Sequence, residues 1–456
     1  MGIPSYFSML MRRHKTVLRT YKGETAANLC LDSNSIVYDM VRTLTYKGDN
    51  AAFEAALIAA VCARLDLYIE KVRPQRVFIA FDGVPPMAKM KQQRERRYKA
   101  ALRAPDGWDT VQITPGTTFM NKLNAGMRAH FDAGYAARFD TFHLSTSAEP
   151  GEGEHKLFAW LREERPGGNT FVYGLDSDLI ILALQHLGMA PGVCLLREAQ
   201  GFNKSAGLQL LNVAALAAQV EQLLGAGKLG DYIFLTFFLG NDFMPHFPAL
   251  NLRTNGLDIL LQTYKEQVKK TEHLITGSDI DWPVVHKMVR ALAARETADV
   301  AREYTDRDKV AVEDTPENLP RLRREVEHYI CPPMSHWEDR YYSMLLKCET
   351  ASVPAVCRDF YRMLEWNATY YVNGCADWKL YYPHAYPPLL RDLAKHAYGG
   401  GAPNGDAKPC SETELLQFIF PASAAHYAAI PYEATVETPE MLWAFCTFDW
   451  ESHLVF

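Results

Sequence analysis

In the stretch Thr170-Phe-Val-Tyr-Gly-Leu-Asp-Ser-Asp178, a mostly apolar run of four residues is followed by two carboxylates. The run predicts a buried strand, and carboxylates at the end of a buried strand are costly unless their charge is compensated. Glu152 and Glu154 form a second acidic pair shortly before it. Two solvated acidic turns would explain either pair alone. Two pairs beside glycines and apolar runs favour a divalent metal site with oxygen ligands.

The same design occurs twice near the N-terminus. Asn28-Leu-Cys-Leu-Asp32 and Arg76-Val-Phe-Ile-Ala-Phe-Asp82 are apolar runs that end in an aspartate, and a helical pattern over 51–72 separates them. Further strands are expected over 137–144, 170–175 and 193–197, with helical segments between them. This alternation predicts an α/β fold with a mostly parallel sheet.

Functional groups of such sheets gather at the carboxyl ends of the strands, so we expect Asp32, Asp82 and Asp176 to meet there. A helix cap or an Asx-turn would explain any one of these aspartates. Three of them together with a glutamate pair are harder to explain in that way. Asp242 follows an apolar helical pattern over 231–241 and is a further candidate ligand.

Residues 89–99 form the densest positive run in the chain. In a helix that starts near Pro86, one face would carry Lys89, Gln93, Arg96 and Arg97. A solvated helix face is the ordinary explanation for an isolated basic helix. This one begins just after Asp82-Gly83, and a helix N-terminus with cationic donors beside a metal site favours a phosphate pocket.

The composition restricts the function classes. The net charge is -6, so a polyanion would have to bind a local basic patch. Nine cysteines without a C-x-x-C pair argue against a structural zinc site and a disulfide framework, and favour reduced thiols inside a cell. We found no membrane-spanning apolar run and no signal-peptide pattern. Residues 297–327 are highly charged and predict a solvated helical or flexible connection near a domain boundary.

Several segments resemble the signature segments of the Xrn family of 5′→3′ exoribonucleases. They are Phe81–Arg97, Pro150-Gly-Glu-Gly-Glu-His-Lys156, Tyr173-Gly-Leu-Asp-Ser-Asp-Leu179 and Gly240-Asn-Asp-Phe-Met-Pro-His246. Later segments resemble the second conserved region of the family, namely Leu364-Glu-Trp366, Tyr370–Trp378 and Tyr381–Leu389. The resemblance implies a PIN-like core, related to flap nucleases, over 1–270 and a charged helical connection over 271–345. A mainly helical second region over 346–456 would pack on the core beside the active site.

The resemblance also implies roles for particular residues. The metal-binding and catalytic acids would be Asp32, Asp82, Glu152, Glu154, Asp176, Asp178 and Asp242. The pocket for a 5′-monophosphate would consist of Lys89, Gln93, Arg96 and Arg97. Tyr38 and Trp366 would line the path of the RNA and stack on its bases. Two Mg²⁺ ions, or Mn²⁺, would be the cofactors, because carboxylates select hard ions over Zn²⁺.

The expected activity is processive, Mg²⁺-dependent 5′→3′ degradation of 5′-monophosphorylated, decapped RNA to mononucleotides. The expected partners are single-stranded RNA and decapping factors, and the expected state is a monomer in the cytoplasm rather than the nucleus. The chain departs from the family at Tyr38, where a histidine is usual, and at Ser33, Ser35, Met87 and Lys91. The large accessory domains of the cytoplasmic members do not follow residue 456, so we expect a minimal catalytic core.

Two alternatives stay open at this point. A structure-specific DNA flap nuclease shares the acidic core, although the second conserved region and the Lys89–Arg97 pocket disfavour it. A catalytically silent RNA-binding scaffold is the other, and the presence of all seven acids disfavours it.

Overall fold

The structure is a computed structural model, and it describes residues 2–3, 5–102, 107–190, 192–199, 207–311, 313, 324–401 and 408–432. Among these residues the chain forms two compact units. Within the described ranges, the sheet unit comprises residues 10–219 and 408–432, and the helical unit comprises residues 2–9 and 220–401. The three sequence regions 1–270, 271–345 and 346–456 remain a prediction.

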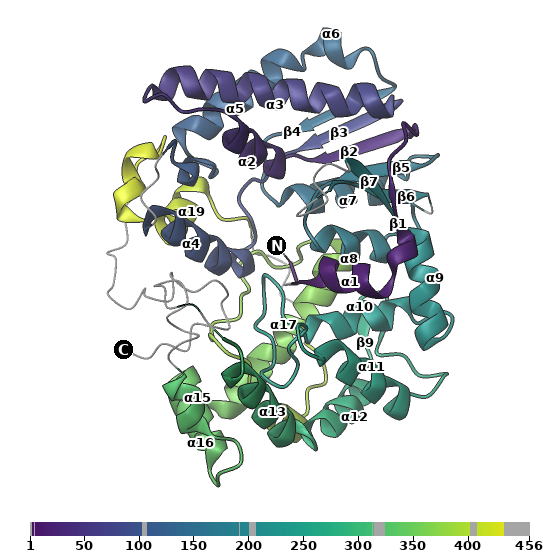
Figure 1. Ribbon diagram of the computed structural model, residues 1–456, viewed down its shortest axis with the longest axis vertical. Coiled ribbons are helices and arrows are strands. Elements are labelled where there is room, and N and C mark those ends of the chain that lie inside the picture. The colour runs from purple at the N-terminus through teal and green to yellow at the C-terminus, as the bar shows by residue number, and fades with distance from the viewer. Residues whose placement is uncertain are drawn as a thin grey trace. The chain divides into compact units, whose positions relative to one another are not determined.

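The sheet unit is built on seven strands (Figure 1). The strands are β1 (Leu18–Thr20), β2 (Asn28–Asp32), β3 (Arg76–Ala80), β4 (Thr141–Ser145), β5 (Thr170–Tyr173), β6 (Val193–Glu198) and β7 (Leu208–Asn212). Their order is β1-β7-β6-β5-β2-β3-β4. Strands β6, β5, β2, β3 and β4 are parallel, and β7 and β1 extend one edge in antiparallel pairing. The expected α/β fold with a mostly parallel sheet is confirmed.

The strand order reverses at β2. The chain runs outward from β2 through β3 to β4, and then returns to place β5 on the other side of β2. In open α/β sheets, ligands bind in the crevice outside the carboxyl ends of the strands at this reversal. Asp32 is the last residue of β2, and Asp176 follows β5. The topology therefore places both predicted acids at the reversal.

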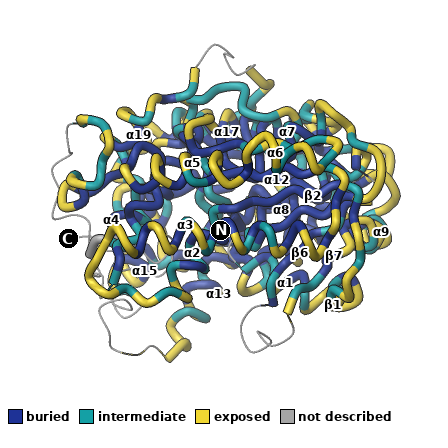
Figure 2. Tube along the Cα trace, turned by 90° about the horizontal axis from the view of Figure 1, so that it is seen from above, coloured by how far each residue is buried: buried dark blue, intermediate teal, exposed yellow. Residues whose placement is uncertain are grey.

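Helices cover both faces of the sheet. They are α2 (Asn34–Thr43), α3 (Asn50–Val72), α5 (Thr118–His130), α6 (Ala133–Ala136), α7 (Gly153–Glu164) and α8 (Asp178–Gln185). Helices α4 (Met87–Leu102) and α19 (Glu412–Ile419) pack on each other in a separate cluster. Side chains of α3 and α5 share a core with Leu29, Leu31 and Ile79 on one face. On the other face, Phe78 packs edge-to-face on Trp160 of α7. Figure 2 shows β2 and α8 buried along their length, which fits their central position.

The strand predictions were confirmed for β2, β3, β5 and β6, with an error at β4. The expected strand over 137–144 begins only at Thr141, because the amides of Ala137, Arg138 and Phe139 donate back to carbonyls of the short helix α6. Strands β1 and β7 were not predicted. Strand β1 has only three residues, none of which is buried, so its sequence lacks the apolar run of a core strand.

The helical unit contains most of the remaining helices. They are α10 (Leu229–Phe237), α11 (Gly256–Gln267), α12 (Trp282–Ala293), α13 (Glu296–Asp308), α15 (Glu325–Ile330), α16 (Trp337–Tyr341), α17 (Val353–Asn373) and α18 (Leu390–Lys395). A small hairpin pairs β8 (Ile275–Thr276) with β9 (Asp279–Ile280). Helices α1 (Tyr6–Arg13) and α9 (Val213–Leu224) contain the residues at which the chain passes between the units. Within the described ranges, every helix is too short or too polar to cross a membrane.

The expected solvated helical or flexible connection over 297–327 is helical along α13, but one face of this helix is buried rather than solvated. Glu296, Asp299 and Glu303 are buried on one face of this helix. Each has a polar partner, such as the Asn251 amide, which donates to Glu303 at 2.5 Å. A charge-rich sequence can pack in this way because paired carboxylates can be buried at an acceptable cost. Residues 312 and 314–323 lie outside the described ranges.

Candidate active site

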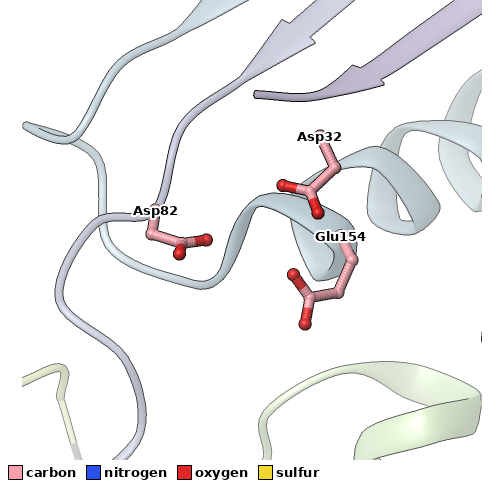
Figure 3. A group of neighbouring side chains, drawn as sticks. All are labelled: Asp32, Asp82 and Glu154. Carbon is pink, nitrogen blue, oxygen red and sulfur yellow. The ribbon is translucent and has the colours of Figure 1, made fainter. Parts of the chain in front are cut away.

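Three predicted acids of the sheet unit converge on one point. One carboxylate oxygen from each of Asp32, Asp82 and Glu154 lies within 4.8 Å of the other two, and Figure 3 shows the three carboxylates facing a common space. Asp32 ends β2, Asp82 follows the neighbouring strand β3, and Glu154 is the second residue of α7. The prediction that strand-end aspartates and the glutamate pair meet in space is correct for these three residues.

Glycines allow the segments that carry these acids to approach closely. A Cβ atom on Gly83 would lie 1.8 Å from the carbonyl oxygen of Glu149, and one on Gly153 would lie 2.7 Å from Oδ1 of Asp32. Gly83 and Gly151 also pair directly, since the Gly83 amide donates to the Gly151 carbonyl at 2.9 Å. A larger side chain at Gly83 or Gly153 would therefore collide with the segments that carry the acids.

Two neighbours fix the carboxylate of Asp82. The Gly153 amide donates to its Oδ1 at 2.7 Å, and the Asn34 side chain donates to its Oδ2 at 2.5 Å. Asn34 also accepts a bond from the Asp82 amide at 3.2 Å. The sequence reasoning missed Asn34. The available signal was its position two residues after the strand-end acid Asp32, which places its amide near the same sheet edge.

Burial and mutual repulsion make the acids costly in the absence of a cation. The pKa of Asp32 is raised well above its usual range, first by burial and then by the charges of Asp82 and Asp176. The pKa of Glu154 is raised in the same way, by burial and by Glu152 and Asp32. In the described part of the chain, Oδ1 of Asp32 is a buried acceptor without a hydrogen-bond partner. A buried, unsatisfied carboxylate oxygen among further carboxylates fits a hard divalent cation.

Glu152 forms an ion pair with the basic helix α4. Its Oε1 lies 2.6 Å from Nζ of Lys89 on α4, and both side chains are almost fully buried. The sequence analysis placed Glu152 among the metal ligands and Lys89 in the phosphate pocket. The structure thus joins the two predicted sites through an ion pair.

Asp176 and Asp178 lie on the turn between β5 and α8. Asp178 is the first residue of α8 and is buried, while Asp176 is partly exposed. The turn begins beside Asp32, since a Cβ on Gly174 would lie 3.4 Å from both Cβ and Oδ2 of Asp32. Asp176 is also close enough to raise the pKa of Asp32. Asp176 therefore borders the three-carboxylate group, whereas the role of Asp178 as a metal ligand remains a prediction.

Asp242 belongs to the helical unit, where it follows α10. Its Oδ2 accepts a hydrogen bond from the Gly2 amide at 3.2 Å. Its role as a metal ligand remains a prediction from the resemblance.

The predicted phosphate-binding face of α4 is largely buried. Lys89, Gln93 and Arg97 are each less than a tenth exposed, and Arg96 is half-buried. Arg97 donates through Nε to Oγ1 of Thr114 at 2.6 Å, and burial lowers the pKa of its guanidinium. Oε1 of Gln93 has no hydrogen-bond partner in the described ranges. A solvated helix face is therefore ruled out for Lys89, Gln93 and Arg97.

The two predicted stacking residues differ in their surroundings. Tyr38 on α2 is half-buried against the core of the sheet unit. Trp366 on α17 is fully buried, stacks on Tyr370 and donates from Nε1 to the carbonyl of Asp377 at 2.8 Å. Contact between Trp366 and an RNA base would require this packing to open. Its role remains a prediction.

Comparison with known proteins agrees with this geometry. Residues 1–199, which carry the strand-end acids and α4, match the family model described as the XRN 5'-3' exonuclease N-terminus. Residues 227–328 and 334–441 match the model described as the Xrn1 helical domain. The chain belongs to the Xrn family. Its PIN-like sheet unit and its helical unit correspond to these two models in order.

Curated Xrn relatives are similar over most of this chain. The 5'-3' exoribonuclease 1 of Saccharomyces cerevisiae is 24% identical over 87% of this chain and 37% of its own length. The 5'-3' exoribonuclease 2 homolog of Drosophila melanogaster is 24% identical over 96% of this chain and 66% of its own length. The 5'-3' exoribonuclease 2 of Gallus gallus is 23% identical over 96% of this chain and 65% of its own length. The chain thus spans between about a third and two thirds of these relatives.

Proposed function

We propose that this Xrn protein is a metal-dependent exoribonuclease that hydrolyses RNA from its 5′ end. The observation that carries the proposal is the group of Asp32, Asp82 and Glu154, in which a buried oxygen of Asp32 has no partner in the described residues. The printed names of the relatives, which are 5'-3' exoribonucleases, support the same reaction class.

The acidic residues would hold Mg²⁺, with Mn²⁺ as the alternative, at two positions. Such ions, when bound, would supply a hydroxide nucleophile by lowering the pKa of water, and positive charge to stabilise the leaving oxygen. Asp32, Asp82 and Glu154 form one set of ligands. Glu152, Asp176, Asp178 and Asp242 complete the proposed site. Asn34 and the Gly153 amide keep the Asp82 carboxylate in place, so that it need not reorganise during the reaction.

The donors on α4 would give the enzyme its direction. Lys89, Gln93, Arg96 and Arg97 would bind a terminal 5′-monophosphate, which sets the scissile bond one nucleotide away and yields mononucleotides. Their burial supports a closed pocket, in which a triphosphate or a cap would lack room. Tyr38 and Trp366 would stack on RNA bases as the strand advances, since aromatic rings accept every base. We also propose processive action.

The biological setting is part of the same proposal. The substrate would be decapped single-stranded RNA, the protein partners would be decapping factors, and the protein would act as a monomer. Cytoplasmic RNA decay fits this substrate better than a nuclear role.

One assay tests the proposed reaction and its polarity. A single RNA with a 3′ label is prepared with a 5′-monophosphate, 5′-triphosphate or 5′-hydroxyl end and incubated with Mg²⁺ or EDTA. We expect Mg²⁺-dependent loss of the monophosphate RNA alone, without a ladder of intermediates. Equal degradation of all three, or internal products, would overturn the proposed pocket.

Variants and a second substrate separate the alternatives. Asp178→Asn should abolish cleavage while RNA binding persists. Asp66→Asn, which changes a carboxylate that pairs with His130 on the protein surface, is the matched control and should keep full activity. Preferential cleavage of a DNA flap would indicate a flap nuclease. Tight, metal-independent RNA binding without turnover would indicate a scaffold.

A further inference from the structure

A buried arginine lies behind the acidic turn between β5 and α8. Arg197 is the fifth residue of β6, and its side chain is only 2% exposed. A buried guanidinium is expensive, and burial lowers the pKa of this one to about 10. Such a residue needs strong local compensation, and its hydrogen bonds show where the compensation comes from.

The guanidinium binds the main chain of the acidic turn. Nη1 of Arg197 donates to the carbonyl oxygen of Asp176 at 3.2 Å, and Nη2 donates to the carbonyl oxygen of Leu175. Both carbonyls lie between the end of β5 at Tyr173 and the start of α8 at Asp178. The planar fork of one arginine thus holds two consecutive peptide groups, a geometry that a lysine ammonium does not reproduce.

The strand pairing explains why Arg197 can do this. Strands β5 and β6 are parallel, with Tyr173 opposite Leu196, and the Gly174 amide donates to the Leu196 carbonyl at 3.3 Å. Arg197 is therefore the next residue along β6 at the level where the turn leaves β5. The following residue, Glu198, bonds instead to Arg64 and Tyr68 of α3. Successive residues of β6 therefore point to opposite faces of the sheet.

The position of the charge adds an electrostatic role. Burial lowers the pKa of Arg197, and the attraction of the Asp176 carboxylate opposes this effect. Asp176 in turn raises the pKa of Asp32 by repulsion. A fixed cation on this side of the turn therefore offsets part of the repulsion among the carboxylates.

We propose that Arg197 is a positioning residue of the carboxylate site, because it holds the Leu175–Asp176 main chain and so sets where Asp176 and Asp178 stand relative to Asp32. This inference rests on the proposed function of the site. It assigns the geometry of the acidic turn to a residue that bonds to the main chain of that turn. Lys156 has a parallel arrangement, since its Nζ donates at 2.9 Å to the carbonyl of Phe81, directly before Asp82.

The test uses metal binding in the absence of RNA. Mn²⁺ affinity is measured by electron paramagnetic resonance for the wild type, Arg197→Met and Arg197→Lys. Groups that orient metal ligands usually contribute 10–100-fold to affinity, so we expect Arg197→Met to weaken Mn²⁺ binding by about tenfold or more. Arg197→Lys should fall between the two, because it restores the charge without the fork.

The control removes a neighbouring arginine that is unrelated to the turn. Arg64→Met abolishes the 2.8 Å bond to Glu198 on the same strand, so it should lower the melting temperature while leaving Mn²⁺ affinity unchanged. Single-turnover cleavage gives a second readout, in which Arg197→Met should lower the rate of the chemical step more than RNA affinity. If Arg197→Met does not fold, Arg197→Gln and Arg197→Lys take its place in the same comparison.

Two failures can be told apart. A folded Arg197 variant with wild-type Mn²⁺ affinity and single-turnover rate would overturn the positioning role alone. A wild type that binds no Mn²⁺ would overturn the proposed metal site, and with it the basis of this inference. Equal losses of Mn²⁺ affinity in Arg64→Met and Arg197→Met would show that both act through general stability, which also overturns the positioning role.

Discussion

Lys89 and Glu152 form a buried ion pair with 2.6 Å between Nζ and Oε1. The pair links the basic helix α4 to the acidic segment that opens α7. Removal of one partner of a buried pair leaves the other charge uncompensated, which usually costs about 3–5 kcal/mol. The proposed phosphate-binding face and the proposed metal site should therefore respond together when either is altered.

We predict that Lys89→Met lowers the free energy of unfolding of the metal-free protein by about 3 kcal/mol, because Glu152 stays buried without its cation. Saturating Mg²⁺ should recover part of this loss, since a cation can compensate Glu152. Preference for 5′-monophosphate over 5′-hydroxyl RNA should also fall. Chemical denaturation with and without Mg²⁺ measures the first effect. An unchanged unfolding free energy would contradict the role of the pair.

Gly153→Ala should impair the site more than the fold. The added Cβ would lie 2.7 Å from Oδ1 of Asp32 and 3.3 Å from Oδ1 of Asp82, so the carboxylates must move. Alanine also favours a helix over glycine by up to about 1 kcal/mol, which offsets the strain. We expect at least a tenfold loss of cleavage with a small change in melting temperature. Gly230→Ala, also at the start of a helix but with no contact closer than 3.6 Å, should keep full activity.

Asn34 should contribute to metal affinity because it holds the Asp82 carboxylate in place. Asn34→Ala removes both bonds to that residue, and Mn²⁺ affinity should fall several-fold as the carboxylate gains freedom. Asn34→Asp should be worse for the metal-free protein, because it places a further negative charge against Asp82. Calorimetric titration of Mn²⁺ into each variant measures the effect. Wild-type affinity in both variants would rule out a positioning role for Asn34.

Glu296 in the helical unit predicts a pH dependence of stability. Its carboxylate accepts bonds from the Leu390 and Arg391 amides at the start of α18, and burial raises its pKa to about 7. The pKa of Glu296 in the folded protein is above the unfolded value of 4.5. Its contribution to the free energy of unfolding is therefore largest below pH 4.5 and is lost as the pH rises through about 7. The total change is about 3 kcal/mol.

The comparison with Glu296→Gln isolates this group. The variant lacks the titrating proton, so the difference in unfolding free energy between wild type and variant should vary with pH between 4.5 and about 7 and level off above it. Glu266→Gln, on the exposed face of α11, should track the wild type at every pH. A pH-independent difference for Glu296→Gln would contradict the raised pKa.

The sequence predicted the site well where chemistry and strand position coincide. Asp32 and Asp82 follow apolar runs, and a parallel sheet brings the ends of such runs to one edge, so their meeting with Glu154 could be expected. The reversal of strand order between β2 and β5 could not be read from the runs, because pairing depends on contacts between distant segments. Asn34 and Arg197 were missed for the same reason, since their bonds join elements that are separate in the sequence.

The burial of charged residues could not be predicted from the sequence either. The spacing of Lys89, Gln93 and Arg97 predicts a shared helix face, but it does not show whether that face meets solvent or protein. The same ambiguity affects α13, which is helical as expected but buries Asp299 and Glu303 on one face. In both cases partners from other segments compensate the charge, and no local pattern reveals those partners.

Cleavage by the metal-loaded protein tests the central claim most directly. Wild type, Asp32→Asn and Glu154→Gln are titrated with Mg²⁺ while they degrade 5′-monophosphorylated RNA with a 3′ label, and RNA binding is followed in parallel. We predict saturable Mg²⁺ activation of the wild type and at least a hundredfold slower cleavage by both variants, with RNA binding preserved. Wild-type cleavage rates in either variant, or undiminished wild-type activity in EDTA, would contradict it.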